Sequence, residues 1–302
     1  MKKTKKLKVS IGIPAYNEEA NIVNLLNNLL NQKTTNVEIK EIIVINDGST
    51  DGTLEKIINF INSNKNTGKK IKIISYDNRQ GKWFAINHFL KAAKSGILVM
   101  ESADTMPKKD AIENMVSPFR NRKVGIIGAH IVPLNKKNCF FGSMAHFIYD
   151  LHHRISLEMP KFGELIAFRN VVKRIPKTIV DEEEIASLIR AKNYEAVYEP
   201  QAIVYNKAPT NFGDMIEQRR RVFCGHLDLM RRKHETIPTV NVINIVKKAA
   251  GIFPEYWMVF FPAAICELIG RVLGFFDYIF YKEKHLKWKM IESVKKVGLK
   301  YP

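Results

Sequence analysis

The chain has 302 residues, of which 46% are hydrophobic, and this supplies one full core with a second region beside it. Extended disorder and low complexity are therefore excluded. Lys and Arg number 48 against 30 Asp and Glu, so the formal net charge is +18, more than solubility requires. So basic a surface is typical of a protein that meets a polyanion, either nucleic acid or an anionic membrane leaflet.

The three cysteines, Cys139, Cys224 and Cys266, are widely spaced. Neither a disulfide framework nor a thiolate metal site is indicated, and a reducing, cytosol-facing location is expected. The basic residues at 2–8 lead directly into the β-branched run 9–13, with no apolar stretch and no cleavage site between them. This start is not expected to be a signal peptide.

Short β-branched runs alternate with runs of helical periodicity over the first 105 residues. The predicted strands and helices, in chain order, are 9–13, 22–30, 42–45, 54–61, 71–75, 83–93 and 97–100. Strands that alternate with helices predict an α/β fold with a mostly parallel sheet covered by helices. Ligands of such sheets bind beyond the carboxyl ends of the strands.

The segments that follow the four predicted strands are polar, and several are acidic. They are residues 14–19, 46–52, 77–82 and 101–104. No GxGxxG follows the first strand and no Walker-type glycine loop occurs, which argues against a dinucleotide dehydrogenase and a P-loop enzyme. A diphosphate ligand would therefore need a divalent metal and Lys or Arg side chains to balance its charge.

The second half of the chain is less regular. Strands are predicted over 124–132 and 164–168 and a helix over 182–192, and the composition shifts beyond about residue 236. The apolar and aromatic stretch 256–281 is interrupted by three charged residues, Glu267, Arg271 and Asp277.

Six short motifs, in order, resemble the signatures of family 2 glycosyltransferases. They are Pro14-Ala15-Tyr16-Asn17-Glu18, Asp47-Gly48-Ser49-Thr50-Asp51, Gly81-Lys82, Ala103-Asp104, Asp181-Glu182 and Gln218-Arg219-Arg220-Arg221. These are inverting nucleotide-sugar enzymes with the GT-A fold, a Rossmann-like sheet covered by helices. The superfamily includes cellulose, chitin and hyaluronan synthases and dolichol-phosphate sugar synthases. The resemblance covers roughly residues 8 to 230.

By this resemblance, the first two motifs bind the donor nucleotide. Pro14 belongs to the first loop, Tyr16 offers a stacking face for a base, and Glu18 and Asp47 can accept hydrogen bonds from ribose hydroxyls or a base N–H. An ordinary turn followed by a helix cap is the alternative for the segment 47–49.

Arg79 and Lys82 are expected to contact the diphosphate or the base, because a cation at a helix N-terminus calls for an anionic ligand. A solvated surface lysine is the alternative for Lys82.

The metal site departs from the family pattern, since its Asp-x-Asp aligns with Ser102-Ala103-Asp104. Asp104 is the predicted ligand of Mg²⁺ or Mn²⁺, completed by diphosphate oxygens and water, with a weaker contact from Ser102. Glu101 cannot share the face of Asp104 in a regular strand. As an alternative, Asp104 could begin a helix.

The acidic run 181–184 corresponds to the family's Thr-Glu-Asp, whose last residue is the general base. We favour Glu182 as the base and keep Asp181 as a candidate. An acidic helix N-terminus, favourable for its dipole, is a serious alternative for Glu183 and Glu184.

The segment from Gln218 to Val222 resembles the family's Gln-x-x-Arg-Trp. Arg221 then neutralises the departing diphosphate. The valine in place of tryptophan makes a processive polymerase less expected. Three adjacent arginines cannot share one face, so Arg219 or Arg220 is expected to be solvated or to face lipid phosphate.

Two further features are weaker. His152, His153 and His226 lack ligand spacing and are expected to be structural. The segment 162–169 resembles the family's segment near the acceptor pocket, although a buried strand explains it equally well.

The stretch 256–281 is long enough to cross a bilayer core of ~30 Å. The central charges Glu267 and Arg271 oppose insertion but can pair at i, i+4. An interfacial helix, or a hairpin broken at Pro262, is as plausible as a span. The run 242–252 is typical of a surface-lying amphipathic helix. A soluble helical subdomain is the alternative that the charge disfavours.

These observations predict a catalytic domain over 1–235 and a membrane-association region over 236–302. The expected protein is a membrane-associated inverting glycosyltransferase on the cytoplasmic side of the cell membrane. Its expected partners are a nucleotide-diphosphate sugar, a lipid-linked or glycan acceptor and an anionic membrane surface, and no nucleic acid is expected. The alternatives are a processive polysaccharide synthase and a non-catalytic membrane or nucleic-acid-binding protein on a degenerate version of the fold.

Overall fold

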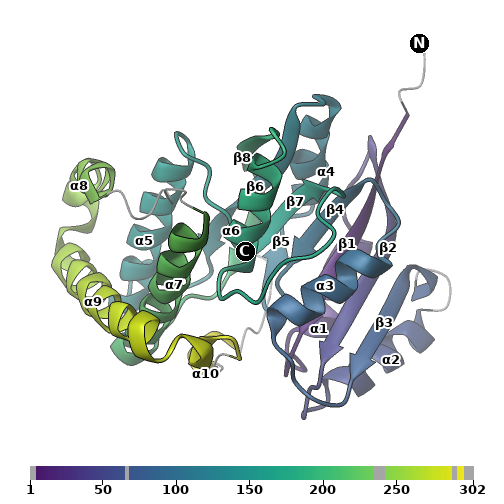
Figure 1. Cartoon of the computed structure of the whole chain (residues 1–302), viewed down its shortest axis with the longest axis horizontal. Coiled ribbons are helices and arrows are strands. Elements are labelled where there is room, and N and C mark those ends of the chain that lie inside the picture. The colour runs from purple at the N-terminus through teal and green to yellow at the C-terminus, as the bar shows by residue number, and fades with distance from the viewer. Residues whose placement is uncertain (1–4, 65–67, 234–241, 288–290, 296–302) are drawn as a thin grey trace.

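The structure is a computed structural model that describes residues 5–64, 68–233, 242–287 and 291–295. Within these residues, eight strands form one mixed sheet in the order β3-β2-β1-β4-β7-β6-β8-β5 (Figure 1). The strands are β1 (Leu7–Ala15), β2 (Val37–Asp47), β3 (Ile71–Tyr76), β4 (Ile97–Glu101), β5 (Met106–Pro107), β6 (Val124–Pro133), β7 (Leu165–Arg169) and β8 (Glu195–Asn206).

Helices cover both faces of the sheet and form a further layer beside it (Figure 1). They are α1 (Ile22–Leu30), α2 (Thr53–Ser63), α3 (Lys82–Ala92), α4 (Ala111–Val116), α5 (Phe140–Ser156), α6 (Asp181–Arg190), α7 (Phe212–Lys233), α8 (Val242–Ala250), α9 (Phe253–Phe280) and α10 (Glu292–Lys295). Every element predicted in the first 105 residues is present with the predicted type.

The first four long strands are parallel, since β1 pairs with β2 and β4, and β2 with β3. Side chains alternate along them, so Ile97 and Val99 of β4 pack on one face and Leu98 and Met100 on the other. The first face is covered by α1, α2 and α4, and the second by α3 and α6. All four carboxyl ends therefore meet at one edge, as predicted.

The antiparallel strand β7 brings a distant part of the chain to this edge. It pairs with β4 so that Leu165 lies opposite Glu101. The backbone N–H of Ser102 donates to the carbonyl oxygen of Glu164 at 2.9 Å. Glu164 therefore stands beside the residues that follow β4, although it is far from them in sequence.

Helix α9 packs along α7 and against α5. A Cβ added to Gly270 would lie 2.5 Å from Cβ of Arg219, and one added to Gly274 would lie 2.5 Å from the carbonyl oxygen of Arg220. The two glycines thus allow a close approach between α9 and α7. The helix continues through Pro262, so the alternative of a hairpin broken at that residue is wrong.

Apolar side chains of α5, α7, α8 and α9 form one shared core. Its members are Met144, Phe147, Met215, Ala249, Ile252, Tyr256, Val259, Ala263 and Cys266. The predicted domain boundary at residues 235 and 236 lies outside the described residues. On either side of it, the helices are joined by this core.

Candidate functional site

A pocket of about 280 Å³ lies at the carboxyl ends of β1, β2 and β4 and extends between α5, α6 and α7. The structure brings all the predicted site residues to its lining. They are Pro14, Tyr16, Glu18, Asp47, Arg79, Lys82, Ser102, Asp104, Asp181, Glu182, Gln218 and Arg221. The motifs that the sequence places at separate strand ends are therefore one constellation in space.

The loops at one end of the pocket are fixed by a carboxylate. Asp47 accepts hydrogen bonds from the backbone N–H groups of Gln80 at 2.8 Å and Gly81 at 2.7 Å. Burial raises the pKa of Asp47, and these two hydrogen bonds oppose that rise. The guanidinium of Arg79 lies 4.0 Å from the ring centre of Tyr16. A planar, basic surface results at this end.

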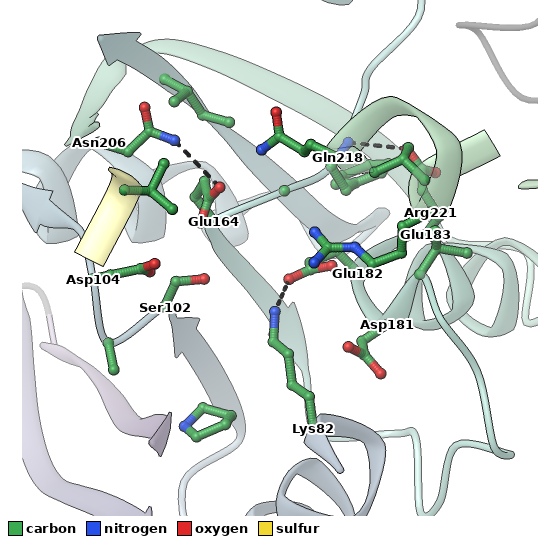
Figure 2. Close-up of a pocket in the computed structure, with 18 of the residues that line it drawn as sticks. Lys82, Ser102, Asp104, Glu164, Asp181, Glu182, Glu183, Asn206, Gln218 and Arg221 are labelled. Atoms are coloured by element: carbon green, nitrogen blue, oxygen red, sulfur yellow. Dashed lines mark hydrogen bonds and ion pairs between the residues drawn. The ribbon is translucent and has the colours of Figure 1, made fainter. Parts of the chain in front are cut away.

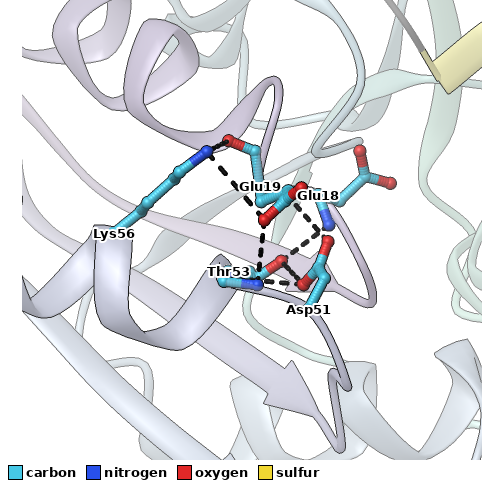
Figure 3. A network of polar contacts seen from close by, with 6 residues as sticks. Glu18, Glu19, Asp51, Thr53 and Lys56 are labelled. Atoms are coloured by element: carbon cyan, nitrogen blue, oxygen red, sulfur yellow. Dashed lines mark hydrogen bonds and ion pairs between the residues drawn. The ribbon is translucent and has the colours of Figure 1, made fainter.

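The first loop is held to the second by a polar network (Figure 3). The hydroxyl of Thr53 accepts from the backbone N–H of Glu18 at 2.7 Å and donates to Asp51 at 2.5 Å. Lys56 donates to the carbonyl oxygen of Glu19 at 3.0 Å. The network fixes the backbone of Glu18, whose buried carboxylate also accepts from a nearby asparagine side chain at 3.0 Å.

The predicted metal ligand has a second carboxylate beside it (Figure 2). Asp104 and Ser102 lie close to Glu164, which accepts a hydrogen bond from Asn206 at 3.3 Å. Burial, followed by the charge of Asp104, raises the pKa of Glu164 to about 7. Glu101 is fully buried and lies outside the pocket lining. Because β4 ends at Glu101, strand alternation does not set the side on which Asp104 lies.

These groups fit a divalent metal because their donor atoms are carboxylate and hydroxyl oxygens, which Mg²⁺ and Mn²⁺ prefer. Among the described residues, no group of three His, Cys, Asp or Glu side chains could hold a metal ion alone. Asp104 does not begin a helix, since β5 follows it. Sequence reasoning missed Glu164, which lay in the segment 162–169 without an assigned role.

Lys82 and Glu182 form an ion pair of 2.5 Å in the centre of the pocket (Figure 2). Burial is the largest influence and would raise the pKa of Glu182, but the charge and hydrogen bond of Lys82, with a backbone hydrogen bond and the charge of Arg221, together hold the pKa below the ordinary value. Burial raises the pKa of Asp181 to about 7 against the opposing charge of Lys82. At neutral pH, Glu182 is therefore the carboxylate that stays ionised.

The other two acidic residues of the run have structural contacts. Glu184 is fully buried and pairs with Arg232 at 2.7 Å. Glu183 lines the pocket and accepts a hydrogen bond from the backbone N–H of Phe162 at 3.2 Å. Both lie in the first turn of α6, where carboxylates are favoured by the helix dipole.

The three adjacent arginines of α7 point in different directions, and these directions differ from those expected from the sequence. Arg220 turns away from the pocket and forms a two-pronged ion pair with buried Asp277 of α9, with one contact at 2.6 Å. Arg219 and Arg221 both line the pocket. Burial lowers the pKa of Arg221 to about 10, so it remains charged at neutral pH. The expectation that Arg219 or Arg220 is solvated or faces lipid is wrong, because α9 covers this side of α7.

The pocket continues beyond Glu164 into an inner limb that the sequence did not predict. Its polar lining residues include Tyr149, His152, Lys161, Arg219 and His226. These histidines have no ligand spacing, so only the fold brings them together.

Known proteins resemble this chain in sequence. The sequence profile of "Glycosyl transferase family 2" matches residues 10–176. Poly-beta-1,6-N-acetyl-D-glucosamine synthase of Staphylococcus epidermidis is 25% identical over 291 residues, 91% of this chain and 68% of that protein. The synthase of Staphylococcus aureus strain COL is 26% identical over 246 residues, 76% of this chain and 58% of that protein.

Two solved structures share the fold. A mannosyltransferase from Pyrobaculum calidifontis in complex with GDP-Man and Mn²⁺ has a TM-score of 0.65 at 17% identity and covers 92% of this chain and 88% of its own. S. aureus TarS 1–349 in complex with UDP-GlcNAc has a TM-score of 0.51 at 16% identity and covers 93% of this chain and 82% of its own. The predicted GT-A fold is confirmed.

Proposed function

Because the chain belongs to glycosyl transferase family 2 and is a glycosyltransferase, we propose that it is a membrane-associated inverting enzyme. It transfers a sugar from a nucleotide-diphosphate sugar to a hydroxyl or phosphate acceptor that is lipid-linked or a glycan, on the cytoplasmic side of the cell membrane. The observation that carries the proposal is the Lys82–Glu182 ion pair beside Arg221 and Asp104 in one pocket.

The donor nucleotide occupies the end of the pocket lined by Tyr16, Asp47 and Arg79. Two structural neighbours of this chain were solved with GDP-Man and with UDP-GlcNAc, which supports a nucleotide-sugar donor. Stacking on Tyr16 holds a base of either kind.

A divalent metal would be held by Asp104 and Glu164, with Ser102 in support and diphosphate oxygens completing its ligands. When bound, it neutralises the charge of the diphosphate. The Mn²⁺ in the mannosyltransferase complex supports this assignment.

The chemistry of the protein side chains follows from the central ion pair. A bound diphosphate competes with Glu182 for Lys82, because it carries more negative charge than one carboxylate. Once released, Glu182 accepts the proton of the acceptor hydroxyl, whose oxygen attacks the anomeric carbon from the face opposite the diphosphate. Lys82 and Arg221 then stabilise the departing diphosphate.

The described helices of the C-terminal region, beyond residue 236, support attachment to a membrane surface. Helix α9 is the one described helix that is long and apolar enough to span a membrane. Its exposed stripe is Trp257, Phe261, Ile265, Leu268, Val272, Phe276 and Ile279, opposite the side that packs on α7. A span would carry α7 and its arginines into the lipid, so we favour a helix that lies in the interface.

A processive synthase is the second candidate, because the S. epidermidis and S. aureus relatives are named as polysaccharide synthases. Val222 in place of the family's tryptophan argues against it. The length of the glycan product, measured by mass spectrometry, separates the two.

Calorimetry with UDP-GlcNAc and GDP-Man, each with and without Mn²⁺, tests the proposal. We expect binding of at least one donor, strengthened by the metal, followed by release of the nucleoside diphosphate when acceptor lipids are added. Absence of binding to a wider panel of nucleotide sugars would overturn the proposal.

A further inference from the structure

The inner limb of the pocket gathers positive charge without a matching carboxylate. Nζ of Lys161 lies 3.0 Å from Nε2 and 3.2 Å from Nδ1 of His152. Lys161 belongs to the loop between α5 and β7, and His152 to α5. Arg219 and His226 come from α7 and lie seven residues apart, so they share one side of that helix.

Among the described residues, neither Lys161 nor Arg219 has a carboxylate at ion-pair distance, whereas Lys82 has one and Arg220 has two. Nε of Arg219 is buried and has no hydrogen-bond partner among the described residues. Buried cationic groups are costly unless an anion meets them.

The acidic groups that face this limb do not neutralise the positive charge of Lys161 and Arg219. Glu267 is held by Arg271 at 2.8 Å. Burial raises the pKa of Glu183 to about 7, so it is only partly ionised at neutral pH. Burial and the charge of Arg219 lower the pKa of Lys161 to about 7, and a bound anion would favour the charged form of Lys161.

We propose that Lys161, Arg219, His152 and His226 form a binding site for a phosphate group carried by the acceptor. This inference rests on the proposed function and names the chemistry of its acceptor. A lysine and an arginine supply charged donors, and each neutral imidazole supplies one N–H. Several donors around one point suit a phosphate, whose oxygens accept in several directions.

The position of the site indicates how such an acceptor arrives. Arg219 contacts α9 at Gly270, and the charged pair of Glu267 and Arg271 also faces this limb. The site therefore lies under the helix that we propose to rest on the membrane. The phosphate can belong to a lipid or to a soluble phosphorylated sugar, and these two sources share the same binding chemistry.

Calorimetry of the full chain with inorganic phosphate tests the site. We expect the wild type to bind phosphate, and Lys161→Met and Arg219→Met to bind it about tenfold or more weakly, because each removes a charged hydrogen bond. Lys161→Arg keeps the charge and should retain binding. Lys192→Met, at an exposed position outside the pocket lining, is the matched control.

Flotation with phosphatidylcholine vesicles separates the sources. If the acceptor is a lipid, a small fraction of polyprenyl monophosphate in the vesicles increases binding of the wild type but not of Lys161→Met. If it is soluble, only inorganic phosphate binds and the vesicles add nothing.

The site inference is overturned if the wild type binds no phosphate in either form, if both Met variants bind it as the wild type does, or if acetate binds equally well. Nucleotide-sugar binding is measured on the same samples. Its absence beside intact phosphate binding would overturn the proposed function and not the site.

Discussion

The ion pair between Lys82 and Glu182 joins residues that are 100 positions apart in sequence, at the N-termini of α3 and α6. A lysine at a helix N-terminus opposes the helix dipole, and a carboxylate at the same kind of position is favoured by it. Each group thus holds the other in its charged form while the pocket is without a donor. The pair also holds the candidate base in place before the substrate enters.

Replacing the base tests this arrangement. We expect Glu182→Gln to keep donor binding and to lose transfer by about 10²-fold or more, since an amide cannot accept the acceptor's proton. Donor affinity by calorimetry and initial transfer rate are the two measurements. Full activity in Glu182→Gln together with an inactive Asp181→Asn would move the role of base to Asp181.

The metal assignment has a readout apart from turnover. Asp104→Asn removes one charge from the pocket, so Mn²⁺ should no longer strengthen nucleotide binding, while the melting temperature stays close to that of the wild type. Asp77→Asn changes an exposed carboxylate at the end of another strand and is the matched control. A metal effect that survives in Asp104→Asn contradicts the assignment.

The sequence placed the predicted residues correctly at the pocket because parallel strands end at one edge, and a motif after a strand is therefore a motif at that edge. The role of Glu164 was not predicted because its position depends on the antiparallel pairing of β7 with β4. That pairing joins segments far apart in sequence, and no local sequence pattern indicates it. The backbone of Glu164 has a φ of 47°, a left-handed conformation that is uncommon for glutamate.

At the scale of the element, α6 combines the candidate base with buried carboxylates in its first turn. Burial raises the pKa of Glu183 to about 7 from its ordinary value of 4.5. The folded state therefore binds the proton of the Glu183 carboxyl more tightly than the unfolded state does. The stability that protonated Glu183 contributes is fully present below about pH 4.5 and is lost as the pH rises towards 7.

Glu183→Gln should consequently raise the free energy of unfolding more at pH 8 than at pH 4.5, by on the order of 2 kcal/mol. The neutral amide can still accept the hydrogen bond from Phe162. Urea unfolding at the two pH values measures the difference, with Glu195→Gln at an exposed position as the control. An equal effect at both pH values would contradict the raised pKa.

The contact between α7 and α9 depends on a glycine. A Cβ at position 274 would lie 2.5 Å from the carbonyl oxygen of Arg220, and a backbone atom cannot move aside as a flexible side chain can. We expect Gly274→Ala to cost about 1–3 kcal/mol in the free energy of unfolding, although alanine is the better helix former.

Thermal unfolding measures this cost. Gly96→Ala is the control, because an added Cβ there meets nothing within 4 Å. A Gly274→Ala protein as stable as the wild type would show that the two helices can separate without loss.

Apolar composition and length identified most of α9 but not its orientation. The stretch is apolar all round, so hydrophobicity alone distinguishes neither a span from an interfacial helix nor the side that packs. The charged residues within the stretch indicate which side of the helix packs against the protein. Asp277 pairs with Arg220 of α7, and Glu267 with Arg271 on the same side of the helix. The apolar stripe opposite to them is the side left for lipid.

At the scale of the whole molecule, a basic protein presents one apolar stripe on α9, the helix that packs against Arg219 of the inner limb. Net charge attracts the protein to an anionic leaflet, and the stripe can then bury its aromatic side chains. Because the stripe lies on the helix that packs against the inner limb, we expect attachment and access to an acceptor in the membrane to be coupled. Removal of the tail would not isolate the catalytic part cleanly, because α9 shares a core with α5 and α7.

Substitution on the exposed stripe therefore tests the attachment better than truncation. Leu268 is 63% exposed and Phe276 is 52% exposed, so their replacement by Glu leaves the contact with α7 intact. Each apolar side chain contributes roughly 1.5–3 kcal/mol when buried, and the double variant should bind vesicles at least about tenfold more weakly.

Flotation with vesicles of phosphatidylcholine and phosphatidylglycerol measures the change at low and high salt. High salt should weaken binding of the wild type without abolishing it, since the lysine contribution of about 1 kcal/mol each is screened and the apolar contribution is not. Ile58→Glu, at a residue on α2 that is 43% exposed, controls for the added charge. Complete release of the wild type by salt would mean that attachment is electrostatic alone, and equal flotation of the double variant and the wild type would show that the stripe does not meet the membrane.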